Sequence, residues 1–180
     1  MNNTEILAPR PGMAKTALTY GLLIGILVIA ISLVFYFSGN LASNFSAYIS
    51  YAVLLGGIIL ATKAWRDEVK GGYISYGQAL GFGTLTIFFA AVLTGIFFFV
   101  FYKLIDPAAI NTLLEAAEDK MINQNPNITD EQLDMALALS KRLMTPFFLA
   151  ISTIFSYTFI GFVLSLITSI FMKKKNPEVF

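Results

Sequence analysis

Three long stretches without a charged residue constrain this sequence more than any other feature. They comprise 47, 32 and 30 residues and are bounded by three pairs of basic residues: Lys15 and Lys63, Lys70 and Lys103, and Arg142 and Lys173. A helix that spans the hydrocarbon core of a membrane needs about 20 predominantly apolar residues. With 57% hydrophobic and only 13% charged residues, the chain is too apolar for a soluble globular domain. We therefore expect an integral membrane protein.

Four membrane-spanning helices are expected from the distribution of residues within these stretches. The first stretch is interrupted by Ser-Gly-Asn-Leu-Ala-Ser-Asn at positions 38–44, and small polar residues of this kind favour a turn over a helix. This break leaves room for two spans, whereas each of the other stretches holds one. The expected spans are residues 17–37, 45–64, 76–102 and 147–172. The predicted fold class is all-α, an integral membrane four-helix bundle in a single membrane domain over residues 1–180.

Residues 106–143 are predicted to form an extracytoplasmic helical hairpin between the third and fourth spans. This segment holds seven of the eleven acidic residues. Asp106 and the proline after it predict the N-cap and first turn of one helix, and Thr129 with Gln132 matches a capping box that opens another. Pro146 leaves two alternatives open, since it either begins a new helix or kinks a continuous one. The hairpin has three candidate contacts, namely the bundle, the lipid surface and a partner.

Lys and Arg are distributed unevenly between the two sides of the predicted bundle. With the N-terminus inside, eight basic residues lie on the inner side and four on the outer side, so the side-chain charges are +4 inside and −3 outside. An excess of Lys and Arg marks the cytoplasmic side, and we therefore expect both termini to be cytoplasmic. Lys173, Lys174 and Lys175 directly follow the last span. They are candidates to anchor it at the membrane surface, with binding of anionic lipid or of a partner as the alternative.

The sequence shows no recognisable catalytic or metal-binding chemistry. It contains neither Cys nor His, which excludes disulfides, thiolate nucleophiles and the usual zinc and haem sites. The interiors of the predicted spans contain no Asp, Glu, Lys or Arg, because Lys63 lies at the end of the second span. Ion-coupled transporters and proton relays usually mark their paths with such residues. The acidic residues of segment 106–143 are spaced as on exposed helix faces. We expect no enzyme activity, no cofactor, no metal and no nucleic acid as a partner.

Small residues recur at helical spacing on the first, third and fourth predicted spans. Small side chains let helix backbones approach closely in lipid, so these stripes predict helix–helix seams, with a substrate groove as the alternative. We expect the face of Gly77, Gly81 and Gly95 to pack against the first or the fourth span. The helix-packing candidates are Gly21, Gly25, Gly77, Gly81, Gly95, Gly161 and Ser165.

The third span has a clear start signal. Ser75 is followed three residues later by Gln78, a spacing that matches a capping box in which each side chain bonds the other residue's backbone N–H. Gln78 is the only side-chain amide within the predicted spans. Besides capping the helix, it is a candidate to hydrogen-bond a neighbouring helix or a partner.

The segment from Trp65 to Leu80, WRDEVKGGYISYGQAL, resembles a signature of bacterial membrane proteins grouped as domain of unknown function family 4199. Their pattern is an aromatic and basic loop, a Gly, and then Ile-Ser-Tyr-Gly-Gln-Ala, found here at 74–79, at the start of a span. The acidic helical insertion before the last span is also similar, and the likeness covers nearly the whole chain. The resemblance implies four spans in a bacterial cytoplasmic (inner) membrane and no established activity.

Two functions from different classes fit these observations. The first is a non-enzymatic accessory protein whose outer hairpin or inner loop at 66–70 binds another membrane component, such as a second cell-envelope membrane protein. The second is a carrier or channel that moves a small solute or lipid through an uncharged groove. A hydrophilic cavity through the bundle favours the carrier, and a closely packed bundle favours the accessory role. Membrane lipids are expected contacts in both cases, and a second copy of the chain is a further candidate partner.

Overall fold

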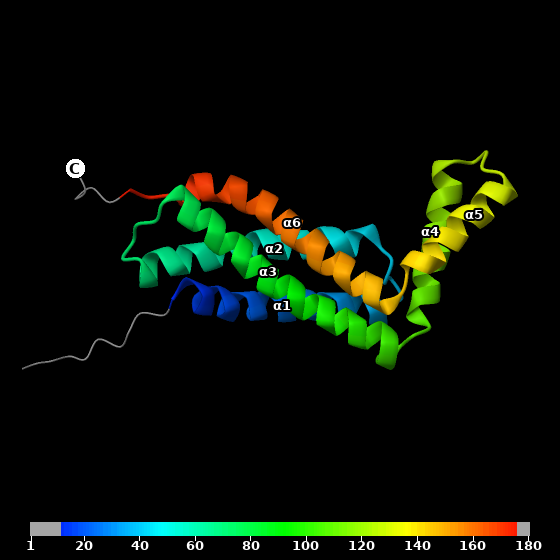
Figure 1. Cartoon of the computed structure of the whole chain (residues 1–180), viewed down its shortest axis with the longest axis horizontal. Coiled ribbons are helices and arrows are strands. Elements are labelled where there is room, and N and C mark those ends of the chain that lie inside the picture. The colour runs from blue at the N-terminus through cyan, green and yellow to red at the C-terminus, as the bar shows by residue number, and fades with distance from the viewer. Residues whose placement is uncertain (1–11, 176–180) are drawn as a thin grey trace, which may run out of the picture.

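The computed structural model describes residues 12–175, which form six α-helices (Figure 1). Two of the helices are prolonged by a π-helical turn. The helices are α1 (Met13–Phe37), α2 (Asn44–Ala64), α3 (Tyr76–Val100), α4 (Ala109–Gln124), α5 (Asp130–Leu143) and α6 (Pro146–Met172), and the turns are η1 (Trp65–Val69) after α2 and η2 (Phe101–Ile105) after α3. The predicted all-α fold class is confirmed.

Four segments of the described chain are long and apolar enough to cross a membrane. They are Met13–Phe37, Asn44–Val69, Tyr76–Ile105 and Pro146–Met172. Each contains or nearly matches one of the four spans expected from the sequence, and the π-helical turns account for the extra length of the second and third. These helices indicate a multi-pass membrane protein.

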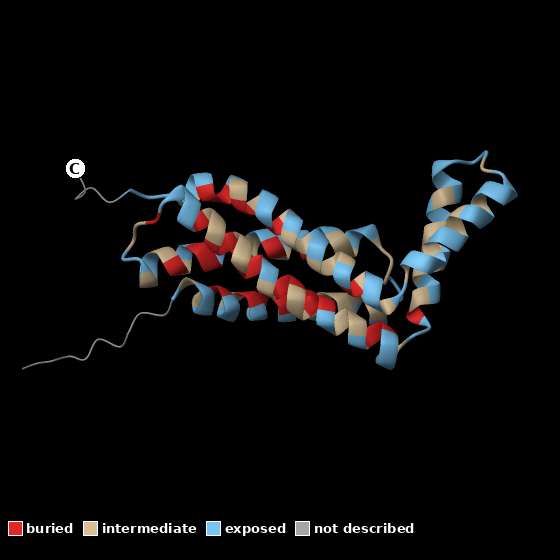
Figure 2. Ribbon diagram, in the orientation of Figure 1, coloured by how far each residue is buried: buried red, intermediate tan, exposed pale blue. Residues whose placement is uncertain are grey.

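The four long helices lie side by side with α3 at the centre of their contacts. Helix α3 packs most extensively against α6 and α1, and α2 contacts α1, α3 and α6. Buried residues concentrate on the inward faces of these helices (Figure 2). The outward faces carry exposed large side chains such as Leu23, Phe155 and Phe171, as expected for helices surrounded by lipid.

The helices approach most closely where a glycine faces a neighbouring backbone or branched side chain. A Cβ added at Gly21 of α1 would lie 2.6 Å from the carbonyl oxygen of Thr86 in α3. One added at Gly95 of α3 would lie 2.5 Å from Ile154 in α6. Because neither contact leaves room for a methyl group, these positions require glycine.

Capping explains where three of the helices begin. Ser75 and Gln78 form both hydrogen bonds of the expected capping box at the start of α3, and Thr129 with Gln132 does the same for α5. The Thr145 side chain accepts a hydrogen bond from the backbone N–H of Phe148, which places Pro146 at the first turn of α6. Since α5 ends at Leu143, Pro146 begins a new helix rather than kinking a continuous one.

The start of α4 differs from the expectation. Asp106 is not its N-cap, because the helix begins at Ala109 and its N-cap, Ala108, offers no side-chain acceptor. One carboxylate oxygen of Asp106 instead accepts a hydrogen bond from the Ala108 backbone N–H at 3.1 Å, and the other accepts one from the Tyr36 hydroxyl at 2.7 Å. Asp106 therefore ties the connection between α3 and α4 to the end of α1.

The hairpin of α4 and α5 stands apart from the bundle and runs across its long axis (Figure 1). Helix α5 has no buried residue, and its extensive contacts are with α4. Only the start of α4 joins the bundle core, where buried Ala109 packs with Phe101 and Tyr102. The predicted hairpin thus exists as two short helices, attached to the bundle at the start of α4 and by a hydrogen bond from Lys120 to Asn44 of α2.

Replacing Gly21 with alanine is expected to destabilise the bundle. The added Cβ would also lie 2.7 Å from the Cβ of Phe89, and overpacking a core of this kind costs about 1–3 kcal/mol. Gly56→Ala is the matched control, since a Cβ there has no atom within 4 Å, and alanine is favoured over glycine in a helix by up to about 1 kcal/mol. The midpoint of thermal unfolding in detergent should fall for Gly21→Ala and not for Gly56→Ala. Equal midpoints would contradict the close approach of α1 to α3.

Candidate functional site

The loop between α2 and α3 and the end of α6 form one connected surface, which we call the loop face (residues 65–75 and 172–175). Ile74 and Lys174 pair in antiparallel fashion through two backbone hydrogen bonds, of 3.0 and 2.9 Å. The Ile74 side chain is 2% exposed and packs in a cluster with Trp65 and Phe82. The loop is thus anchored both through its backbone and in the core.

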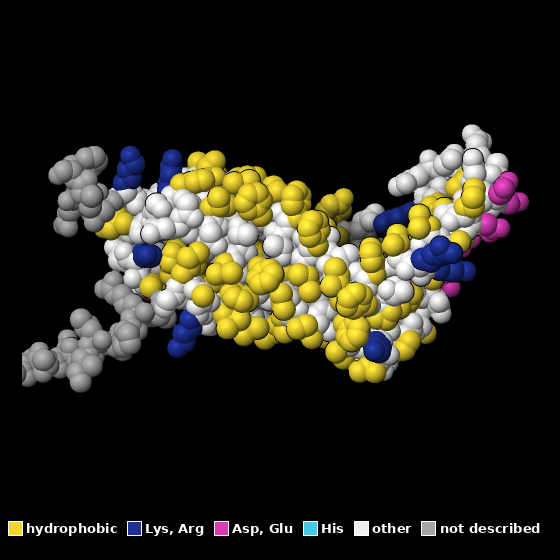
Figure 3. All heavy atoms as spheres, viewed as in Figure 1, with side chains coloured by type: hydrophobic (Ala, Val, Ile, Leu, Met, Phe, Trp, Pro, Cys, Tyr) yellow, Lys and Arg dark blue, Asp and Glu magenta, His cyan; other side chains and the backbone are white. Residues whose placement is uncertain are grey.

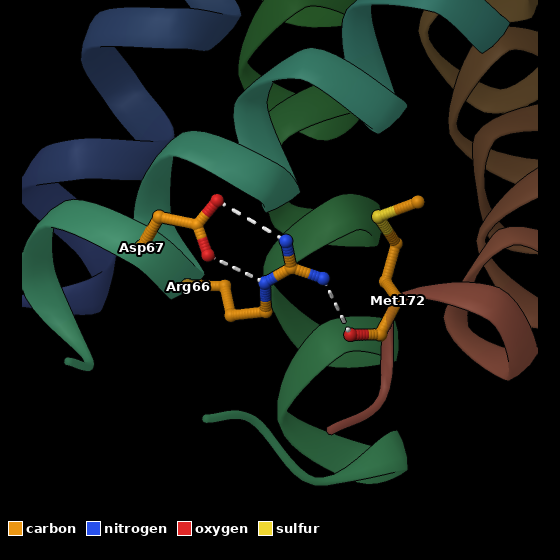
Figure 4. Close-up of polar contacts among 3 residues, drawn as sticks. All are labelled: Arg66, Asp67 and Met172. Carbon is orange, nitrogen blue, oxygen red and sulfur yellow. Dashed lines mark hydrogen bonds and ion pairs between the residues drawn. The ribbon is translucent and has the colours of Figure 1, made fainter. Parts of the chain in front are cut away.

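Arg66 makes a second connection between the loop and α6 (Figure 4). Its Nε and Nη2 atoms donate to the two carboxylate oxygens of Asp67 at 2.7 and 3.1 Å, and its Nη1 donates to the Met172 carbonyl at 3.4 Å. The last carbonyls of a helix carry partial negative charge, so a guanidinium is favourable there. The Asp67 side chain is 43% exposed, and an ion pair this accessible contributes about 0–1 kcal/mol. Its main effect is to orient Arg66.

The local sequence explains the shape of the loop. Gly71 and Gly72 have φ angles of +70° and +92°, a region that side chains other than glycine rarely adopt. They reverse the chain between η1 and the capping box of α3. The Tyr76 hydroxyl then donates to the Leu166 carbonyl at 3.3 Å, which joins the first turn of α3 to α6.

Aromatic residues of the loop face support its cationic side chains. Trp65 is 2% exposed and stacks on Phe82 with ring centroids 4.5 Å apart. The Lys70 ammonium lies 5.2 Å from the centroid of the Trp65 ring, and the Lys174 ammonium lies 5.6 Å from that of Tyr73. Exposed cation–π pairs contribute about 0.5–1 kcal/mol each. The predicted membrane-surface residues Lys173, Lys174 and Lys175 are all exposed at this end of the bundle.

A hydroxyl-lined pocket of about 200 Å³ lies at the end of the bundle opposite the loop face, between α1, α2, α3 and α6. Much of its hydrogen-bonding capacity is used internally, since Ser32 and Ser50 donate to carbonyls of their own helices at 2.9 Å. One helical turn deeper, Val28 and Leu54 are fully buried in the central apolar cluster. The pocket therefore ends at a packed layer. Its polar side chains are Ser32, Ser43, Ser46, Ser50, Tyr102 and Tyr157.

An apolar groove of about 500 Å³ runs along the outer side of α3 and α6. Gly77 and Gly81 border it, together with Phe88 of α3 and Phe162 of α6. A Cβ added at Gly77 would have no atom within 4 Å, and one at Gly81 would meet only the terminal methyl of Met13. The expectation that these two glycines pack against a neighbouring span is therefore wrong for Gly77. Gly81 does face α1, but only through the side chain of Met13, whose terminal methyl would lie 3.2 Å from an added Cβ.

The other small-residue candidates lie between helices. Gly21 and Gly25 face α3, Gly95 faces α6, and a Cβ at Gly161 would lie 2.5 Å from Ile87. Ser165 is fully buried and faces Gly83, where an added Cβ would lie 2.6 Å from its Oγ. Sequence reasoning missed Gly83 and also Gly57, which faces Ile24. A second small-residue stripe on α3 could have revealed Gly83: Ala79, Gly83, Thr86, Ala90 and Thr94, all buried.

The described residues, 12–175, offer no group of three or more His, Cys, Asp or Glu side chains arranged to hold a metal ion. The two capping residues have structural partners, because Gln78 Oε1 accepts from the Ser75 backbone N–H at 3.1 Å and Ser75 Oγ accepts from that of Gln78 at 3.2 Å.

Comparison with known proteins relates this chain to one family by sequence. Neither the curated proteins nor the solved structures contain a match to this chain. The sequence model of the family described as "Protein of unknown function (DUF4199)" matches residues 19–174. This range includes all of α1 except its first six residues, the other three long helices, the loop face up to Lys174 and the hairpin. It therefore covers both the Trp65–Leu80 segment and the acidic insertion that carry the resemblance. The chain belongs to the DUF4199 family.

Proposed function

We propose that this protein is a non-enzymatic accessory membrane protein that binds another membrane protein through the loop face. The observation that carries this proposal is the way in which residues 65–75 are held. Backbone pairing with Lys174, the Arg66 contact with Met172 and the buried Ile74 side chain hold this loop in one arrangement. A preordered surface loses less conformational entropy when a partner binds.

The charges on the loop face suit a polar partner. Asp67, Glu68 and Lys70 are exposed, and Asp67 is already bound to Arg66. Glu68 and Lys70 therefore present opposite charges on a fixed backbone. Paired charges of this kind contribute to the specificity and the rate of association more than to its affinity.

The packing of the bundle supports an accessory role over a carrier. The hydroxyl-lined pocket ends at the apolar cluster that includes Val28, Leu54 and Ile87, each fully or almost fully buried. A solute moving through the bundle would have to displace this layer. The groove beside Gly77 is open to the surroundings of the bundle rather than directed through it.

We place the loop face in the cytoplasm and the hairpin outside it, in a bacterial cytoplasmic membrane. The bias of Lys and Arg supports this orientation, because α1 begins and α6 ends at the same end of the bundle as the loop face (Figure 1). Lys and Arg side chains are visible at this end, and acidic side chains gather on the hairpin (Figure 3).

Cysteine labelling tests this orientation. The natural chain has no Cys, so Lys120→Cys and Lys174→Cys each provide a single reactive thiol. A membrane-impermeant maleimide added to intact cells is expected to label position 120 and not position 174, and permeabilised cells should label both. Labelling of position 174 alone in intact cells would reverse the proposed orientation. Labelling of both would contradict the topology.

A charge reversal on the loop face tests the partner proposal. Glu68→Lys should remove a co-purifying membrane protein, because the side chain is exposed and its reversal repels the basic group that it would meet. Glu131→Lys, the same reversal at an exposed position of the hairpin, is the matched control and should retain that protein. The measurement is quantitative mass spectrometry after affinity purification in mild detergent.

Two results would contradict this proposal. One is recovery of the same partner with Glu68→Lys as with the parent protein. The other is recovery of the chain alone, combined with solute flux in reconstituted vesicles that disappears in an inactive variant. The latter result would favour the carrier function.

A further inference from the structure

Helix α5 carries an apolar stripe that nothing in the described chain covers. Met135, Leu139 and Leu143 follow one another at intervals of four residues and are 62%, 58% and 41% exposed. Residues four apart lie on one face of a helix. The half-buried residues Leu133 and Leu137 lie on another face, which is the one available for packing against α4. The stripe is thus a second apolar face, separate from the one used within the hairpin.

The base of the hairpin fixes the level of this stripe relative to the membrane. Leu143 precedes Pro146, the first residue of the last candidate span, by only three positions. Phe147 is 67% exposed on the first turn of that span, and Leu104 and Ile105 at the end of the preceding one are 72% and 61% exposed. Exposed side chains of this size mark where the apolar part of the bilayer still surrounds the bundle. The stripe of α5 therefore begins at the bilayer boundary.

Contacts of α4 hold the hairpin across the end of the bundle. The Lys120 ammonium donates to Asn44 Oδ1 at 2.9 Å, Tyr36 binds Asp106 at 2.7 Å, and Ala109 is buried among the aromatic residues of α3 and η2. The hairpin consequently runs across the bundle axis, and its tip extends beyond the side of the bundle (Figure 1). A segment in this position faces the surface of the surrounding lipid.

The distribution of charges on the hairpin suits a position at the lipid surface, where basic side chains are favoured near the lipid phosphates. Its acidic side chains gather along the edge farthest from the bundle, while Lys and Arg side chains lie nearer to it (Figure 3). Lys141 and Arg142 occupy the last turn of α5, and Asp130 and Glu131 occupy the first. The basic pair is therefore closest to the bilayer boundary, where lipid phosphates are found.

From this arrangement we infer that α5 is an interfacial helix, whose Met135–Leu139–Leu143 stripe is immersed in the phospholipid surface beside the bundle. The stripe ends at Leu143, four residues before a row of exposed apolar side chains on α6, in which Phe147, Ile151 and Phe155 are 67%, 50% and 74% exposed. An amphipathic helix of this kind buries its apolar face to a depth of about 5–10 Å in the boundary between headgroups and acyl chains. This contact is independent of the partner surface at the other end of the bundle.

Nitroxide labels on opposite faces of α5 test the inference in the full-length protein. Leu139→Cys and Asp134→Cys each create the only thiol in the chain, and both positions are exposed. The labelled proteins are reconstituted in nanodiscs of phosphatidylcholine and phosphatidylglycerol. Electron paramagnetic resonance then compares collisions with oxygen, which concentrates in lipid, and with a water-soluble nickel chelate. A label at Phe155→Cys supplies the reference for a lipid-exposed position.

The label at position 139 is expected to have a severalfold higher ratio of oxygen to nickel collisions than the label at 134, and a ratio nearer to that at 155. Met135→Cys should reproduce the result, so the test does not depend on one variant. Equal access of nickel to positions 134 and 139 would overturn the inference. So would shielding of position 139 from both reagents, because that pattern would show that protein rather than lipid covers the stripe.

Discussion

The close approach of α3 to its neighbours is the contact on which the rest of the structure depends. Between helices surrounded by lipid there is little hydrophobic driving force, so association relies on packing and on the distance between backbones. Gly21 lets α1 reach the Thr86 carbonyl of α3, and Gly95 with Gly161 lets α3 and α6 interlock around Ile154 and Ile87. These contacts place the two ends of α3 beside the ends of its neighbours. The loop face and the base of the hairpin are built on those ends.

The positions of charged residues, together with the polar break at 38–44, are sufficient to predict the four helical spans, because an uncharged stretch of suitable length has few alternatives in a membrane. Local hydrogen-bonding chemistry similarly predicts the capping boxes at Ser75 and Thr129. Which face of α3 packs was harder to predict, since Gly77, Gly81 and Gly83 look equivalent in sequence. The stripe of small residues through Gly83 is a sequence signal for its burial, but only the three-dimensional arrangement of the helices shows that the Gly77 face is open. Asp106 illustrates a second limit, because its bond to Tyr36 joins residues 70 positions apart.

The two ends of the bundle are organised differently. At one end a short loop is pinned to α6 and presents charges on an ordered backbone. At the other, two amphipathic helices are attached through α4, and α5 has no buried residue. Between these ends lies a layer of buried apolar residues that includes Val28, Leu54 and Ile87. This division places the loop face and the hairpin at opposite ends of the four candidate membrane spans.

The pairing of Ile74 with Lys174 also has a consequence for biosynthesis. The two residues are 100 positions apart in the sequence, so Lys174 leaves the ribosome only after the hairpin and the last span have been made. Until then Ile74 has no backbone partner, and the loop lacks the support of α6. The finished loop face consequently forms only in chains whose last span has been inserted. A nascent chain that stalls earlier would reach the membrane without it.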